Sequence, residues 1–197
     1  MVDHRLKPLL PLGGDAQQID TFDGLTITES AELALASLAC RQLRAAQFAS
    51  ASQALFGMAM PGPGKVASAA FYGVIWTGPE QWIVEAPVAT HGDIANILKA
   101  GLGDAASVSE QTDGWVRFIA HGPRLADVFE RLCALDIRRM QTGEATRTLI
   151  EHLGCLVICR ESQRQLHILG PRSAARSLHH ALVSAARSAL SEPAPTR

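Results

Sequence analysis

The sequence lacks a charge bias, long apolar runs and an abundance of aromatic residues. Its 197 residues carry a formal net charge of −1, so it has neither a basic footprint for nucleic acid nor an acidic solvating block. No run of about 18 apolar residues is present, which argues against a membrane-spanning helix. Aromatic residues make up 5%, yet hydrophobic residues make up 47%, which is enough for a packed core. The composition predicts one domain, or two small halves sharing a core, with no nucleic-acid or membrane partner.

Targeting and disulfide signals are also missing. Residues 6–11 are too few and too rich in proline for the apolar region of a signal peptide. We place Cys155 and Cys159 on one strand, where residues four apart are separated by about 13 Å, too far for a disulfide. With Cys40 and Cys133 they are expected to be buried free thiols. These features predict a cytoplasmic protein.

Catalytic motifs are absent from the sequence as well. The glycine cluster at residues 57–64 contains two prolines and leads into no helix, unlike a dinucleotide-binding turn. The seven histidines do not show the spacing of a helical zinc site. Glu144 and Glu151 flank Arg147, which is typical of a solvated ion-pair surface. A Cys–His pair could still meet in space, but local sequence does not favour one. We therefore predict no catalytic, cofactor-binding or metal-binding residue on this chain.

Proline, glycine and hydrophobic periodicity predict an alternating series of elements. Residues 1–30 are expected to form an extended arm with one possible strand at 25–28, and residues 191–197 a disordered tail. Between them, strands are expected at 39–44, 71–77, 81–86, 105–112, 115–120, 153–160 and 165–169, and helices at 31–38, 46–56, 91–100, 125–135 and from about 173 to 190.

A turn and a repeat organise these elements. Asp113 and Gly114 favour a type I′ turn, which would join strands 105–112 and 115–120 as a hairpin. Gly122-Pro123-Arg124 and Gly170-Pro171-Arg172, 48 residues apart, each follow a strand and open a helix. The order predicts an α+β fold of two split βαβ, ferredoxin-like halves, with mainly antiparallel sheets and helices on one face. The halves are 31–112, a βαββαβ unit, and 113–190, a βαββα unit.

Several residues are candidates for a contact with a partner protein. Trp76, Trp82 and Trp115 lie on expected strands, where core packing is the ordinary role, but tryptophan is also enriched at interfaces. Two methionines beside a proline suit a contact loop better than a surface facing bulk solvent. The candidate interface consists of Met58, Met60, Pro61, Trp76 and Arg147.

An ordered set of short motifs resembles the gamma subunit of heterotetrameric sarcosine oxidase. The resemblance runs from about residue 34 to residue 190, and none of its motifs is a catalytic signature. The motifs are Leu55-Phe56-Gly57, Met60-Pro61, Trp76-x-Gly78-Pro79-x-x-Trp82-Ile83-Val84, Gln111-Thr112-Asp113-Gly114-Trp115-Val116, Gly122-Pro123, Leu132-Cys133-x-Leu135-Asp136, Arg147-Thr148, Arg160-Glu161 and Arg172-Ser173-x-Ala175-x-Ser177-Leu178.

The resemblance implies a non-catalytic subunit with a fold similar to the folate-binding glycine-cleavage T-protein. Its partners would be the alpha, beta and delta subunits of a complex that oxidatively demethylates sarcosine to glycine and forms hydrogen peroxide. It implies no cofactor on this chain, and FAD, FMN, NAD, zinc and tetrahydrofolate on the partner subunits.

Two alternatives remain. One is a stand-alone folate-binding aminomethyltransferase-like protein, and the other is an unrelated α/β interaction module. A related iron–sulfur assembly family carries a Lys-Gly-Cys-x-x-Gly-Gln-Glu motif, whereas this chain has Met140-Gln141-Thr142-Gly143-Glu144-Ala145. The chain is also short for either enzyme.

Overall fold

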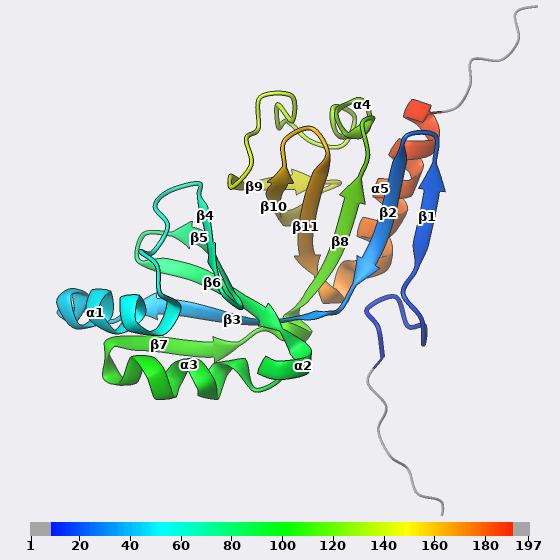
Figure 1. The fold of residues 1–197 in the computed structure, drawn as a ribbon. Coiled ribbons are helices and arrows are strands. Elements are labelled where there is room, and N and C mark those ends of the chain that lie inside the picture. The colour runs from blue at the N-terminus through cyan, green and yellow to red at the C-terminus, as the bar shows by residue number, and fades with distance from the viewer. Residues whose placement is uncertain (1–8, 191–197) are drawn as a thin grey trace, which may run out of the picture.

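A computed structural model describes residues 9–190, and they form two antiparallel sheets (Figure 1). One sheet has the order β1-β2-β8-β11-β10-β9 and the other the order β4-β5-β6-β3-β7. We call them the six-stranded and the five-stranded sheet. The strands are β1 (Ile19–Phe22), β2 (Leu25–Ser30), β3 (Leu33–Cys40), β4 (Val66–Ala69), β5 (Tyr72–Gly78), β6 (Gln81–Pro87), β7 (Ala106–Glu110), β8 (Trp115–His121), β9 (Ala145–Ile150), β10 (Leu153–Glu161) and β11 (Gln165–Pro171).

Helices cover one face of each sheet. The helices are α1 (Ala45–Phe56), α2 (Val88–His91), α3 (Ile94–Leu102), α4 (Leu125–Phe129) and α5 (Ala175–Leu190), with short 3₁₀ turns η1 (Gly103–Ala105), η2 (Thr112–Gly114) and η3 (Arg172–Ala174). Helices α1 and α3 share a hydrophobic core with the five-stranded sheet, and α4 and α5 share another with the six-stranded sheet. The expected α+β fold class is thereby confirmed.

A smaller core lies between the inner faces of the sheets. It contains Ile75 and Ile83 from one sheet and Leu156, Ile158 and Leu169 from the other. Because side chains alternate along a strand, neighbours of these residues point outward to the helices. The layers therefore follow the order helix, sheet, sheet, helix, and the two sheets meet at an angle (Figure 1).

The two sheets repeat one topology, but the N-terminal segment completes the second copy. The order β7-β3-β6-β5 in the five-stranded sheet matches β2-β8-β11-β10 in the six-stranded sheet, with β4 and β9 as added edge strands. The second half lacks a last strand of its own, so β2 fills that position and pairs antiparallel with β8. Within the expected arm of residues 1–30, the possible strand at 25–28 lies inside β2, whereas β1 was not expected. Residues 1–8 and the expected tail at 191–197 lie outside the described residues.

Two further expectations differ from the structure, each at a place where the two sheets meet. The expected helix at 31–38 is strand β3, four of whose eight residues are buried because helices cover one of its faces and the other sheet covers the opposite one. A strand buried on both faces loses its period-two pattern, so its leucines resemble a helical stripe. The expected hairpin at Asp113 and Gly114 is the turn η2, which leads from β7 in one sheet to β8 in the other.

Direct hydrogen bonds join the edges of the sheets. The Val66 N–H donates to the Gly143 carbonyl at 2.8 Å, and the Ala145 N–H donates to the Gly64 carbonyl at 2.9 Å. Lys65 and Glu144 form an ion pair at 2.9 Å beside them. These contacts align strands β4 and β9, which the sequence pattern did not predict.

Candidate functional site between the two sheets

Four polar side chains gather in the otherwise apolar space between the sheets. Glu85 points from β6 of the five-stranded sheet, whereas Arg117, Arg160 and His167 come from β8, β10 and β11 of the six-stranded sheet. Strand alternation produces this placement, because Val84 and Ala86 on either side of Glu85 belong to the helix-facing core. We call these four residues the inter-sheet network.

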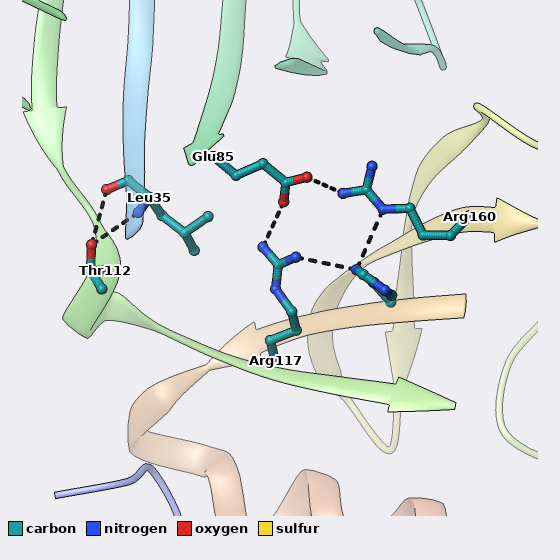
Figure 2. Close-up of polar contacts among 6 residues, drawn as sticks. Leu35, Glu85, Thr112, Arg117 and Arg160 are labelled. Carbon is teal, nitrogen blue, oxygen red and sulfur yellow. Dashed lines mark hydrogen bonds and ion pairs between the residues drawn. The ribbon is translucent and has the colours of Figure 1, made fainter. Parts of the chain in front are cut away.

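Glu85 connects the two sheets through both of its carboxylate oxygens. The Arg117 Nη2 atom donates to Glu85 Oε2 at 2.6 Å, and the Arg160 Nη2 atom donates to Glu85 Oε1 (Figure 2). His167 Nδ1 accepts from Arg117 Nη1 at 3.2 Å and from Arg160 Nε at 3.4 Å. A guanidinium group only donates, so His167 carries its proton on Nε2. Its Nδ1 is occupied and does not serve as a general base.

The network carries more positive than negative charge. Burial alone would raise the pKa of Glu85, but Arg117 and Arg160 outweigh it and hold the pKa below its ordinary value. Burial and the same two arginines lower the pKa of His167 to about 3, so the imidazole is neutral near pH 7. Two guanidinium groups therefore face one carboxylate, which leaves one unbalanced positive charge. Buried ion pairs of this kind contribute more to orientation than to stability.

Gly73 on β5 makes room for the Glu85 carboxylate. Gly73 and Glu85 are paired residues of adjacent strands. A Cβ atom at position 73 would lie 2.5 Å from Glu85 Oε1, which is closer than real Cβ contacts allow. The glycine is therefore needed for the position of the carboxylate.

A cavity adjoins the network where the chain passes between the sheets. Its volume is about 590 Å³, and Arg117 forms part of its wall. We call it the junction cavity, because the β2–β3 connection, η2 and the segment before β1 all line it. The lining residues are Leu9, Leu10, Pro11, Asp15, Ser30, Ala31, Leu33, Leu35, Val88, Gly92, Glu110, Thr112, Asp113, Trp115, Arg117 and Arg172.

Hydrogen bonds fix two walls of the junction cavity. Thr112 Oγ1 accepts from the Leu35 N–H at 2.9 Å, which ties η2 to β3 (Figure 2). The Leu12 N–H donates to Glu29 Oε1 at 2.8 Å, and Glu29 is itself buried on β2. The segment before β1 is thus attached to the six-stranded sheet. The cavity walls are bonded to strands of both sheets.

The structure brings two of the five candidate interface residues to one cavity. Trp76 and Arg147 both line a second cavity of about 260 Å³ beside the joined edges of the sheets. Met58 and Met60, like Trp76, pack against the core under α1 and α3. Pro61 is buried, and its carbonyl accepts from Trp82 Nε1 at 2.9 Å. Met58 and Met60 are half-buried, because the loop covers its own core.

The cysteines are free thiols spread over both halves of the fold. All four cysteines are free, as expected, but Cys40 and Cys133 are only half-buried. Burial raises the pKa of Cys155 to about 11, so this thiol is protonated near pH 7. Within residues 9–190, no group of three or more His, Cys, Asp or Glu side chains could hold a metal ion. Among these residues, no helix is both long enough and apolar enough to cross a membrane.

The sequence reasoning missed the inter-sheet network. Its members interrupt strongly apolar strands, as in Trp-Ile-Val-Glu-Ala around Glu85 and Leu-Val-Ile-Cys-Arg before Glu161. A charged residue on the buried face of a strand must find a partner, which is the signal that could have identified the network. The sequence does not show which strands face one another.

Comparisons with known proteins give a likeness of fold. No family model and no curated protein sequence matches the chain. A chain of the heterotetrameric sarcosine oxidase from Corynebacterium sp. U-96, solved with pyrrole 2-carboxylate, matches with a TM-score of 0.77 and 20% identity. The match covers 90% of this chain and 91% of that one.

The glycine cleavage system aminomethyltransferase T from Bartonella henselae matches with a TM-score of 0.59 and 14% identity. That match covers 82% of this chain but 48% of the transferase, so this chain spans about half of its length. The chain therefore has a T-protein-like fold, which it shares over nearly its full length with a chain of a heterotetrameric sarcosine oxidase.

Proposed function

We propose that this protein is the non-catalytic gamma subunit of a heterotetrameric sarcosine oxidase. The proposal depends on the extent of the structural likeness to the Corynebacterium oxidase chain. The match covers 90% of this chain and 91% of the oxidase chain. Two chains of the same extent and fold are suited to the same place in an assembly. The proposed complex demethylates sarcosine to glycine and produces hydrogen peroxide.

The proposed partners are the alpha, beta and delta subunits, which would carry the cofactors. FAD, FMN, NAD, zinc and tetrahydrofolate are assigned to those chains by the resemblance of the sequence motifs. A cytoplasmic location is part of the proposal. It is supported by the four free cysteines, which are typical of a reducing compartment.

A stand-alone folate-binding aminomethyltransferase-like protein is the second candidate. The shared fold with the Bartonella transferase favours it, but this chain spans only 48% of that protein. The likeness to the Corynebacterium chain covers 91% of that chain and favours the subunit role.

The proposed contact with partner subunits lies at the joined edges of β4 and β9. Arg147 and Leu149 alternate on β9 with the same orientation as Ala145, which belongs to the core between the sheets. Beyond that core they are exposed, and the Leu149 side chain is a large apolar one with 63% exposure. Half-buried Trp76 shares a cavity with Arg147. Leu149 is thus an exposed apolar residue on the same strand as Arg147, and tryptophan and arginine are enriched at interface centres.

Affinity purification of the tagged chain from its native organism tests the proposal. We expect three partner chains, flavin absorption bands and peroxide formation that depends on sarcosine. Recovery of a colourless protein without partners would refute the subunit role, and folate titration of that protein would then test the second candidate.

Paired variants locate the contact. Leu149→Asp should reduce recovery of the partners, whereas Arg164→Glu, an exposed change on the β10–β11 turn, should not. Equal recovery with both variants would show that the edge of β9 is not the interface.

A further inference from the structure

The junction cavity combines apolar walls with one buried cation. Among the described residues that line it, Arg117 is the only one both charged and buried, with 4% exposure. Its two terminal nitrogens bond Glu85 and His167, and its Nε–H takes part in neither bond. Apolar side chains make up much of the remaining wall: Leu9, Leu10, Pro11, Leu33, Leu35, Val88 and Trp115.

The charge around Arg117 is not balanced within the protein interior. Glu85 is the one carboxylate that Arg117 and Arg160 share, and neutral His167 adds none. Buried charge is costly without a partner of opposite sign. An anionic group in the cavity would supply that partner, because Arg117 forms part of the cavity wall.

The acidic residues of the cavity lie at its rim, where water solvates them. Asp15, Glu110 and Asp113 are exposed, and the Asp113 carboxylate lies 3.5 Å from Arg172 Nη1. Exposed carboxylates are screened by solvent and salt. The rim therefore opposes an anion weakly, while the interior attracts it.

We propose that the junction cavity binds a small organic carboxylate, with its carboxylate on Arg117 and its apolar body against Leu33, Leu35 and Trp115. Charge-assisted bonds to guanidinium groups suit carboxylate geometry, and apolar walls with one convergent polar group are typical of small-molecule sites. The volume of about 590 Å³ lies within the usual range for such sites. This inference goes beyond the proposed subunit role and does not depend on it.

Calorimetric titration of the full chain tests the inference with three probes of matched chemistry. Benzoate combines a carboxylate with an apolar ring, benzamide keeps the shape without the charge, and sulfate keeps a negative charge without the ring. We expect saturable binding of benzoate that is at least about tenfold tighter than that of benzamide or sulfate. No saturable binding of benzoate, or equal binding of benzamide or sulfate, would overturn the proposal.

Two variants and a control place the ligand. Arg117→Met removes the cation, and Val88→Trp extends a ring into the cavity from a residue with 40% exposure, so the second change does not disturb the core. Each should weaken benzoate binding by about tenfold or more. Leu43→Trp, which is exposed and outside the cavity lining, should leave binding unchanged. Unchanged binding in a folded Val88→Trp protein would show that benzoate binds elsewhere.

Discussion

His167 should make the free energy of unfolding depend on pH between about pH 7 and pH 3. The folded protein holds the imidazole neutral, because burial and the neighbouring arginines lower its pKa from an ordinary value of 6.5 to about 3. The unfolded chain takes up a proton near pH 6.5. The stabilising contribution is therefore complete above pH 6.5 and is lost as the pH falls toward 3.

The size of this effect follows from the two pKa values. Between pH 7 and pH 5 the unfolded chain gains about 0.7 of a proton at His167, whereas the folded chain gains almost none. Linkage converts this difference into a loss of about 2 kcal/mol in the free energy of unfolding. His167→Gln should abolish this part of the pH dependence, because an amide oxygen accepts hydrogen bonds but does not titrate.

Urea unfolding at pH 7, 6 and 5, followed by tryptophan fluorescence, measures the difference. The wild-type protein should lose about 2 kcal/mol more than His167→Gln between pH 7 and pH 5. His180→Gln serves as the control, because His180 is an exposed residue of α5. Parallel pH profiles for wild type and His167→Gln would refute the account of the inter-sheet network.

Three further predictions concern stability. Glu85→Ala should lower the free energy of unfolding by about 3–5 kcal/mol in urea titrations, because it leaves two arginines without their carboxylate; a loss below about 1 kcal/mol would contradict this. Gly122→Ala should cost about 1–3 kcal/mol, since Gly122 has a φ of 145° and its Cβ would lie 2.3 Å from a backbone oxygen of the β1–β2 turn, whereas Gly62→Ala should be nearly neutral. Trp82→Phe should lower the free energy of unfolding by about 1–3 kcal/mol, because it removes the hydrogen bond to the Pro61 carbonyl. Calorimetric melting measures this change, and an unchanged melting temperature would contradict the prediction.

Local signals in the sequence identified many of the helices and strands. Gly57 ends α1 in the left-handed conformation that glycine favours, as expected. The hairpin of β5 and β6 and that of β10 and β11 also appear where alternation and turn residues indicated them. These elements depend on neighbours along the chain, which is why a single sequence was sufficient.

Edge strands and long-range pairs were not predictable in the same way. Strand β4 and strand β9 are short and lie at sheet edges, where the hydrophobic pattern is weak. The pairing of β2 with β8 joins segments about 90 residues apart, and no local signal encodes it. Trp76 and Arg147 line one cavity, and the role of the five candidate residues at an interface stays a prediction.

The sequence by itself determined the fold class, because composition, periodicity and turn residues act over a few neighbouring positions. It also placed Arg117 on the same face of its strand as Trp115. Only the tertiary structure decided that this face meets Glu85 from the other sheet, since β6 and β8 bring together residues 32 positions apart. The physical reason is that a buried charge requires a partner but does not specify where in the chain the partner lies. The packing of the two sheets supplied that partner and, beside it, the junction cavity.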